Sequence, residues 1–443
     1  MKLLRLWLSC LLVVVMLVFT SKPALAFCGF YVAKADSSLY NQASQVIIAR
    51  DGDRTVLTMS NDYQGDVQDF AMVVPVPVIL KEEQVHVGDS KILTRLDGFS
   101  APRLVEYFDP DPCQPEAFYD GYNFYESEDA NVPAVRQRKI EADLGVTVEE
   151  QFSVGEYDIL ILSAKESDGL ETWLIQNGYK IPKGASELLQ PYIRQNLKFF
   201  VAKVNLEEYD SNGFEKLRPL AMAYESPKFM LPIRLGMMNA NGDQDLIVYL
   251  LSPNGQVELT NYRTVKIPSD TEIPEFVKVE FKDFYTSMFQ KSYEQENKKV
   301  AFLEYAWDMG SCDPCSAEPL NPEELKEAGV FWLDRTSNNR WGGSNVFITR
   351  LHVRYSRDKF PEDLKFQNTS DRANFQGRYV INHPFRGEMT CREASQYQQT
   401  VRDRQEREAQ NLASLTGWEI DDIRSKIEFI KAKSNSWWRN IWE

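Results

Sequence analysis

The sequence has few of the residues and motifs on which most enzymes depend. It holds three histidines, and no glycine-rich phosphate loop, Gly-x-Ser-x-Gly elbow or His-Glu-x-x-His pair stands out. The motifs of phosphate-loop proteins, α/β-hydrolases and zinc proteases are thus missing. We predict no metal site and no cofactor.

Basic residues are also in deficit, with 50 lysines and arginines against 65 aspartates and glutamates. The predicted leader over residues 1–26 holds three of the basic residues and none of the acidic ones, so the mature chain has a net charge of about −18. Such a charge repels nucleic acid. We therefore expect no nucleic-acid partner.

Long hydrophobic runs are absent after the first 20 residues. The longest later run, Phe70 to Leu80, is interrupted by Pro75 and Pro77, and this pattern predicts a buried edge strand rather than a membrane span.

The N-terminus, by contrast, has the pattern of a signal peptide. Lys2 and Arg5 precede an apolar stretch over residues 6–19, and Ala24-Leu25-Ala26 provides a cleavage site. We expect a mature N-terminus at Phe27, with an uncleaved anchor as the alternative. The expected location is therefore periplasmic, extracellular or peripheral on the outer face of a membrane.

The rest of the chain predicts an α+β protein of mainly antiparallel, sandwich-like β-sheet. The expected divisions are a β-rich domain over 27–165, a helical insertion over 166–197, a second β-rich domain over 198–390 and a helical tail over 391–443. Residues 45–59 predict a hairpin around Asp51-Gly52, because β-branched residues flank a turn signal. Residues 102–108 predict a short helix that Ser100 caps.

Five cysteines remain after the predicted cleavage, and an exported location favours disulfides between them. Their spacing leaves the pairing open. The sequence Cys312-Asp313-Pro314-Cys315 indicates a structural disulfide, with redox catalysis as one alternative and a metal site completed by His352 and His383 as the other. The disulfide candidates are Cys28, Cys113, Cys312, Cys315 and Cys391.

A predicted strand places three basic residues on one face. Alternation puts Arg350, His352 and Arg354 together, so this strip is a candidate for binding a carboxylate or phosphate. The alternative is an exposed sheet face whose basic residues form ion pairs with nearby acidic residues.

Four spaced motifs resemble the exported bacterial family catalogued as domain of unknown function 2330. They begin at residues 28, 154, 173 and 312 and read Cys-Gly-Phe-Tyr-Val, Val-Gly-Glu-Tyr-Asp, Trp-Leu-Ile-Gln-Asn-Gly-Tyr and Cys-Asp-Pro-Cys. The resemblance implies export and a β-rich body. It assigns no reaction and no catalytic residue.

These observations favour an envelope protein that binds or assembles rather than catalyses. The alternatives are a thiol-disulfide oxidoreductase using Cys312 and Cys315, and an anion-binding protein. The tail between residues 424 and 443 is near +3 and aromatic, which predicts attachment to an envelope protein or membrane surface. The attachment residues would be Trp437, Trp438, Ile441 and Trp442.

Overall fold

A computed structural model describes most of the chain between residues 30 and 431. The described residues are 30–31, 40–64, 71–114, 145–177, 185–205, 207–209, 217–238, 242–311, 313, 316–333 and 345–431. The expected signal peptide and the residues after Lys431 lie outside these ranges.

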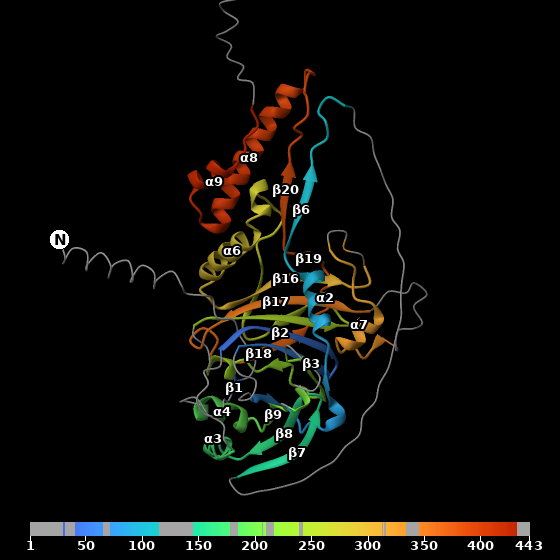
Figure 1. Cartoon of the computed structure of the whole chain (residues 1–443), viewed down its shortest axis with the longest axis vertical. Helices are drawn as coiled ribbons and strands as arrows, with labels where there is room; N and C mark the ends of the chain where they lie inside the picture. Colours follow the sequence, from blue (N-terminus) through green and yellow to red (C-terminus); the bar gives the residue numbers. More distant parts are fainter. Residues whose placement is uncertain are drawn as a thin grey trace, which may run out of the picture.

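A nine-stranded mixed sheet crosses the middle of the molecule (Figure 1). The hairpin predicted over residues 45–59 is confirmed, and its turn uses Gly52 at φ +58°, a left-handed conformation that favours glycine. β12 is parallel to β2 and β14 is parallel to β16. Across the sheet the strands are β14 (Arg263–Lys266), β16 (Val300–Asp308), β17 (Phe347–Tyr355), β12 (Gln244–Ser252), β2 (Tyr40–Asp51), β3 (Arg54–Gln64), β10 (Leu220–Glu225) and β5 (Val85–Val87), with β19 (Phe375–Gln376) also paired to β16.

A five-stranded antiparallel sheet packs against one face of the larger sheet. Alternation along β2 directs Val46 and Ile48 toward this second sheet, while Ile47 and Ala49 point to the opposite face. The sandwich-like α+β class predicted from the sequence is therefore confirmed. In order, the second sheet contains β1 (Phe30–Tyr31), β4 (Ala71–Val76), β9 (Lys198–Val204), β8 (Tyr157–Ala164) and β7 (Val146–Val154).

Helices cover the two outer faces of this sandwich. α3 (Ser167–Gln176) and α4 (Ala185–Arg194) pack on the five-stranded sheet, so the segment 166–197 holds the helices expected there. α2 (Ser90–Ser100), α6 (Phe281–Gln295) and α7 (Pro322–Glu327) cover the nine-stranded sheet. The apolar layers between helices and sheets are continuous cores that hold the sandwich together.

Short elements complete the body. β11 (Met230–Leu231), β18 (Leu364–Asn368) and β13 (Val257–Leu259) form a three-stranded sheet. η2 (Glu82–Gln84) and η3 (Leu235–Met238) are single 3₁₀ turns. Strands from both segments 27–165 and 198–390 enter the nine-stranded sheet, since β2 pairs with β12 and β3 pairs with β10.

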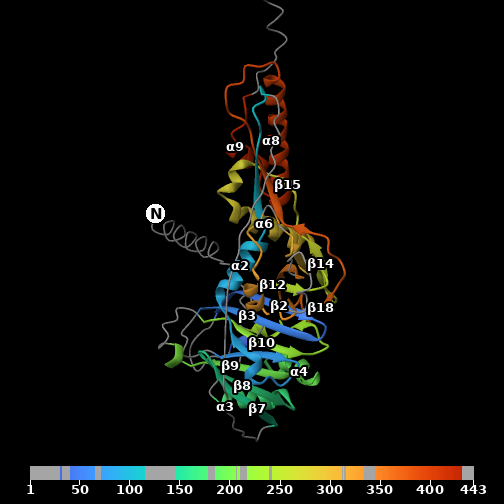
Figure 2. The same cartoon turned by 90° about the vertical axis from the view of Figure 1, so that its right-hand side faces the viewer.

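An arm extends from the sandwich (Figures 1 and 2). It consists of a parallel sheet of β15 (Thr271–Glu272), β20 (Arg378–His383) and β6 (Arg103–Phe108), together with η4 (Glu275–Lys278), α8 (Ala394–Thr416), α9 (Ile420–Lys426) and residues 427–431. A disulfide joins Cys113, which follows β6, to Cys391, which precedes α8. The predicted helical tail is present, and Gly417 ends α8 in the left-handed conformation.

Two local predictions are wrong. Residues 103–108 form strand β6 rather than a helix, because they pair in parallel with β20. Ser100 is the last residue of α2, where its hydroxyl donates to the Leu96 carbonyl, so it caps no following helix. β4 is also not an edge strand, since β9 pairs along all of it and β1 pairs with Met72 and Val73.

None of the described helices has both the length and the apolarity that crossing a bilayer requires.

Candidate functional site

The basic strip predicted on residues 350–354 lies inside the protein. Arg350, His352 and Arg354 share one face of β17, which lies between β16 and β12 in the nine-stranded sheet. His352 is 9% exposed, and Arg350 is likewise buried. The alternative of an exposed sheet face is therefore wrong, because α2 and α6 cover this face.

Three carboxylates neutralise the strip. Glu304 on β16 accepts hydrogen bonds from Arg350 Nε at 2.6 Å and lies 2.8 Å from His352 Nδ1. Asp245 on β12 lies 3.1 Å from His352 Nε2 and accepts two bonds of 2.7 Å from Arg354. The third carboxylate, Asp97 on α2, accepts from Arg350 at 2.7 Å, and the Tyr285 hydroxyl donates to Glu304.

These contacts fix the charge of the cluster. Burial alone would lower the pKa of His352, but the Glu304 charge and hydrogen bonds to both carboxylates raise it to about 9. Burial would raise the pKa values of Glu304 and Asp245, but the same cationic partners hold both at about 2. Three positive groups thus face three negative ones, and an external anion would have to displace a carboxylate of the chain.

The cysteine candidates separate into one described pair and three residues outside the described ranges. Cys113 and Cys391 form the arm disulfide, whereas Cys28, Cys312 and Cys315 lie outside. Across the part of the chain that the structure describes, no cluster of histidine, cysteine and acidic residues could hold a metal ion. The predicted attachment residues Trp437, Trp438, Ile441 and Trp442 are also outside the described ranges.

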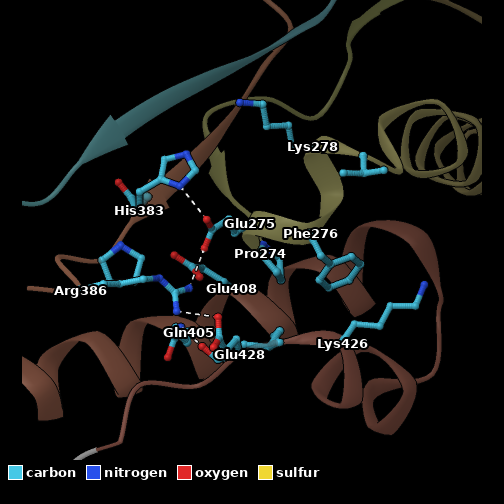
Figure 3. Close-up of a pocket in the computed structure, with 14 residues that line it drawn as sticks. Pro274, Glu275, Phe276, Lys278, His383, Arg386, Gln405, Glu408, Lys426 and Glu428 are labelled. Carbon is cyan, nitrogen blue, oxygen red and sulfur yellow. Dashed lines mark hydrogen bonds and ion pairs between the residues drawn. The ribbon is translucent and has the colours of Figure 1, made fainter.

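The arm contains a pocket of about 410 Å³ that the sequence did not reveal (Figure 3). Its walls come from η4, the end of β20, one face of α8 and the segment after α9. The acidic and basic residues in its lining are Glu275, Lys278, His383, Arg386, Glu408, Lys426 and Glu428.

The basic side chains of this lining all have carboxylate partners. Arg386 contacts Glu275 at 3.2 Å and Glu428 at 2.6 Å. His383 lies between Glu275 at 2.9 Å and Glu106 at 2.7 Å. The two lysines are paired in the same way, Lys278 with Glu106 at 2.9 Å and Lys426 with Glu280 at 2.7 Å.

Glu408 differs from the other charged residues of the lining. Its side chain is on α8, the residue is 3% exposed, and its Oε1 accepts no hydrogen bond from the described residues. Arg404 Nε is 3.5 Å from this oxygen, but the other Arg404 nitrogens donate to Asp109 at 3.0 and 2.8 Å. Burial raises the pKa of Glu408 to about 7, and Arg404 opposes this rise only in part.

A helical period in the sequence could have pointed to Glu408. Val401, Gln405, Glu408 and Leu412 recur at intervals of three and four, and all four are buried on one face of α8. This face is hard to recognise in the sequence, because charged and polar residues surround it and few of its own residues are apolar.

By its architecture the protein is of the α+β class, with a layered body and an arm that contains a disulfide. The chain belongs to the family described as an uncharacterized protein conserved in bacteria, domain of unknown function 2330, which matches residues 22–367. The resemblance seen in the sequence is thereby confirmed. No curated protein and no solved structure matches the chain significantly. The match includes η4 but ends before His383, so α8 and α9 lie beyond it.

Proposed function

We propose that this protein is an exported envelope protein that binds or assembles with other molecules, and that the arm is its binding part. The observation that carries this proposal is the arm itself, which extends from the sandwich and contains a pocket. Ligand sites are typically concave and preformed, with a few polar groups in an apolar wall. The arm pocket is a concavity of this kind, although acidic and basic residues make up half of its lining.

Two observations support export. The N-terminal sequence has the charge, apolar core and small residues of a signal peptide. The disulfide between Cys113 and Cys391 is a bond that persists in oxidising compartments outside the cytoplasm.

The arm is built as a fixed platform, which suits binding. α8 packs on α6, where Lys291 donates to the Ser414 carbonyl at 2.6 Å. At the other end, the disulfide connects the segments that follow β6 and β20. Because both ends of α8 are fastened, a ligand on the arm meets a preorganised surface.

The C-terminal tail is a second element of the proposed attachment. Residues 427–431 run back along α8, where the Ile430 amide donates to Gln405 and Phe429 packs beneath Arg402. This direction leads toward the disulfide. Arg424 and Lys426 are paired with Glu406 and Glu280, so the cations left for an anionic surface are those from Lys431 onward.

Site-specific photo-crosslinking in the native envelope tests the arm as the binding part. Val279 lies at the pocket rim and is 91% exposed, whereas Ile175 on α3 is 53% exposed at the opposite end of the molecule. A photoreactive residue at position 279 should yield a discrete adduct that is absent from position 175. Identical adducts at both positions contradict the proposal.

Two further measurements test the rest of the proposal. N-terminal sequencing of protein recovered from the envelope should begin at Phe27, and recovery from the cytoplasm with Met1 intact contradicts export. An insulin-reduction assay should give no turnover. Turnover that disappears in Cys315→Ser would instead identify a thiol-disulfide oxidoreductase.

A further inference from the structure

We propose that the terminal segment, residues 432–443, folds back onto the arm and covers the mouth of its pocket, with its tryptophans against Phe108 and Val279. This inference goes beyond the role proposed above, because it assigns an occupant from the chain itself to the arm surface. The docking does not depend on what the arm binds in the envelope.

The first argument is the apolar surface that the arm exposes. Phe108, at the end of β6, is 74% exposed, and Val279, just after η4, is more exposed still. Among the described residues, the other large apolar side chains that are exposed are Ile79, Tyr107 and Ile175. Exposed apolar side chains that lie close together on a folded protein mark a surface that another group covers.

Phe108 and Val279 belong to one such surface. The Phe108 ring stacks on His383 with the ring centroids 4.4 Å apart, and His383 is part of the pocket wall (Figure 3). Val279 lines the same pocket, and the residue before it, Lys278, contacts Glu106 on β6 at 2.9 Å. The two exposed side chains therefore flank a single concave region.

The second argument is the place where the described chain ends. Ile427 and Glu428 line the pocket, so the chain passes its wall just before the terminal segment begins. The Gln405 side chain then holds the backbone against α8, since it donates to the Glu428 carbonyl at 3.1 Å and accepts from the Ile430 amide at 2.9 Å. The terminal segment thus starts on the arm, a few residues from the pocket.

The third argument is the length and sequence of the terminal segment. At about 3.3 Å per residue, residues 432–443 extend up to about 40 Å, which is enough to return to the pocket. Residues 434–436 read Ser-Asn-Ser, a sequence that favours a turn, and Trp437 and Trp438 follow directly. A reversal at this turn brings both indole rings back toward the pocket.

Tethering makes even a weak contact sufficient. Indole rings bury a large apolar area and pair favourably with other aromatic rings, so they suit a surface that contains Phe108. A short flexible tether holds the segment at an effective concentration on the order of 1 mM. With an intrinsic dissociation constant of about 0.1 mM, about nine tenths of the chains would then have the segment docked.

Docking would make the two binding elements of the protein compete. A partner in the arm pocket and the terminal segment exclude each other, so attachment of the tryptophans to an envelope surface would uncover the pocket. This consequence rests on the proposed function, whereas the docking itself does not.

Photo-crosslinking of the purified full mature chain, without lipid or partner, tests the docking. p-Benzoylphenylalanine at position 108 replaces one exposed aromatic side chain with another, and the same residue at position 175, exposed on α3, is the matched control. Trypsin cuts after Lys433 and Arg439, so the terminal segment gives peptides 434–439 and 440–443. Position 108 should be crosslinked to one of these peptides within a single chain, with at least tenfold higher yield than position 175.

Tail variants show whether the tryptophans make the contact. Trp437→Ser combined with Trp438→Ser should lower the crosslinking yield from position 108 at least fivefold. Asn440→Ser, which changes the same segment but keeps its tryptophans, should leave the yield within about twofold.

Four results would each overturn the proposal. They are no crosslink between position 108 and the terminal segment, equal yields from positions 108 and 175, an unchanged yield in the double tryptophan variant, and crosslinks only between two chains. The last result would assign the surface to a second copy of the protein. None of these results bears on the envelope adduct expected from position 279, so the two proposals fail separately.

Discussion

Replacing His352 with glutamine should remove a pH-dependent part of the stability of this protein. The pKa of His352 is about 9 in the folded state and about 6.5 for an unperturbed histidine. Its contribution is therefore fully present below pH 6.5 and is lost as pH rises through 9. At about 1.4 kcal/mol per pKa unit, the difference corresponds to about 3 kcal/mol.

Denaturant unfolding at pH 6, 7, 8 and 9 measures this loss. Between pH 6.5 and 9 the free energy of unfolding of the natural protein should fall by about 3 kcal/mol more than that of His352→Gln. His86→Gln is the matched control, since His86 is exposed on β5 and should leave the pH dependence unchanged. Parallel pH profiles for the natural protein and His352→Gln, or an NMR titration of His352 near pH 6.5, would refute the reasoning.

Three other predictions concern the disulfide, the body and the tail. Cys391→Ser should lower the free energy of unfolding by about 2–5 kcal/mol and increase hydrogen exchange in α8, while exchange in β2 stays slow. Asp363→Ala should cost about 3 kcal/mol in denaturant unfolding, because the buried Tyr192 hydroxyl and Ile233 amide both donate to this carboxylate, at 2.6 and 3.0 Å. A chain ending at Ser434 should co-sediment less with anionic liposomes than the full mature chain, and equal co-sedimentation would reject a membrane role for the tail.

Local patterns predicted local structure well. The hairpin around Asp51-Gly52 and the helix of the C-terminal tail depend on residues close in sequence, and both are present. The prediction of a helix over residues 102–108 was wrong because the structure of this segment depends on a distant part of the chain. A six-residue run after Pro102 suits either a helix or a strand, and the deciding partner, β20, lies more than 260 residues further along the chain.

The candidate sites required the tertiary structure. Alternation placed Arg350, His352 and Arg354 on one face, but their burial depends on carboxylates from α2, β12 and β16. Glu408 looked like one of many charged residues on a solvent-exposed helix. Its burial follows from the packing of α8 against the arm sheet and α6, and the spacing of the buried residues along α8 is the one sign of this packing in the sequence.

The strand order of the nine-stranded sheet has a consequence for how the chain reaches its native state. β2 and β3 can pair as soon as they leave the ribosome, but β2 needs β12 and β3 needs β10 on their outer edges. Until residues 220–252 have been synthesised, the apolar hairpin therefore has two unpaired edges, the kind of surface that recruits other strands. A chaperone that keeps these edges covered during synthesis should raise the yield of folded protein, and Cys391 can meet Cys113 only near the end of the process.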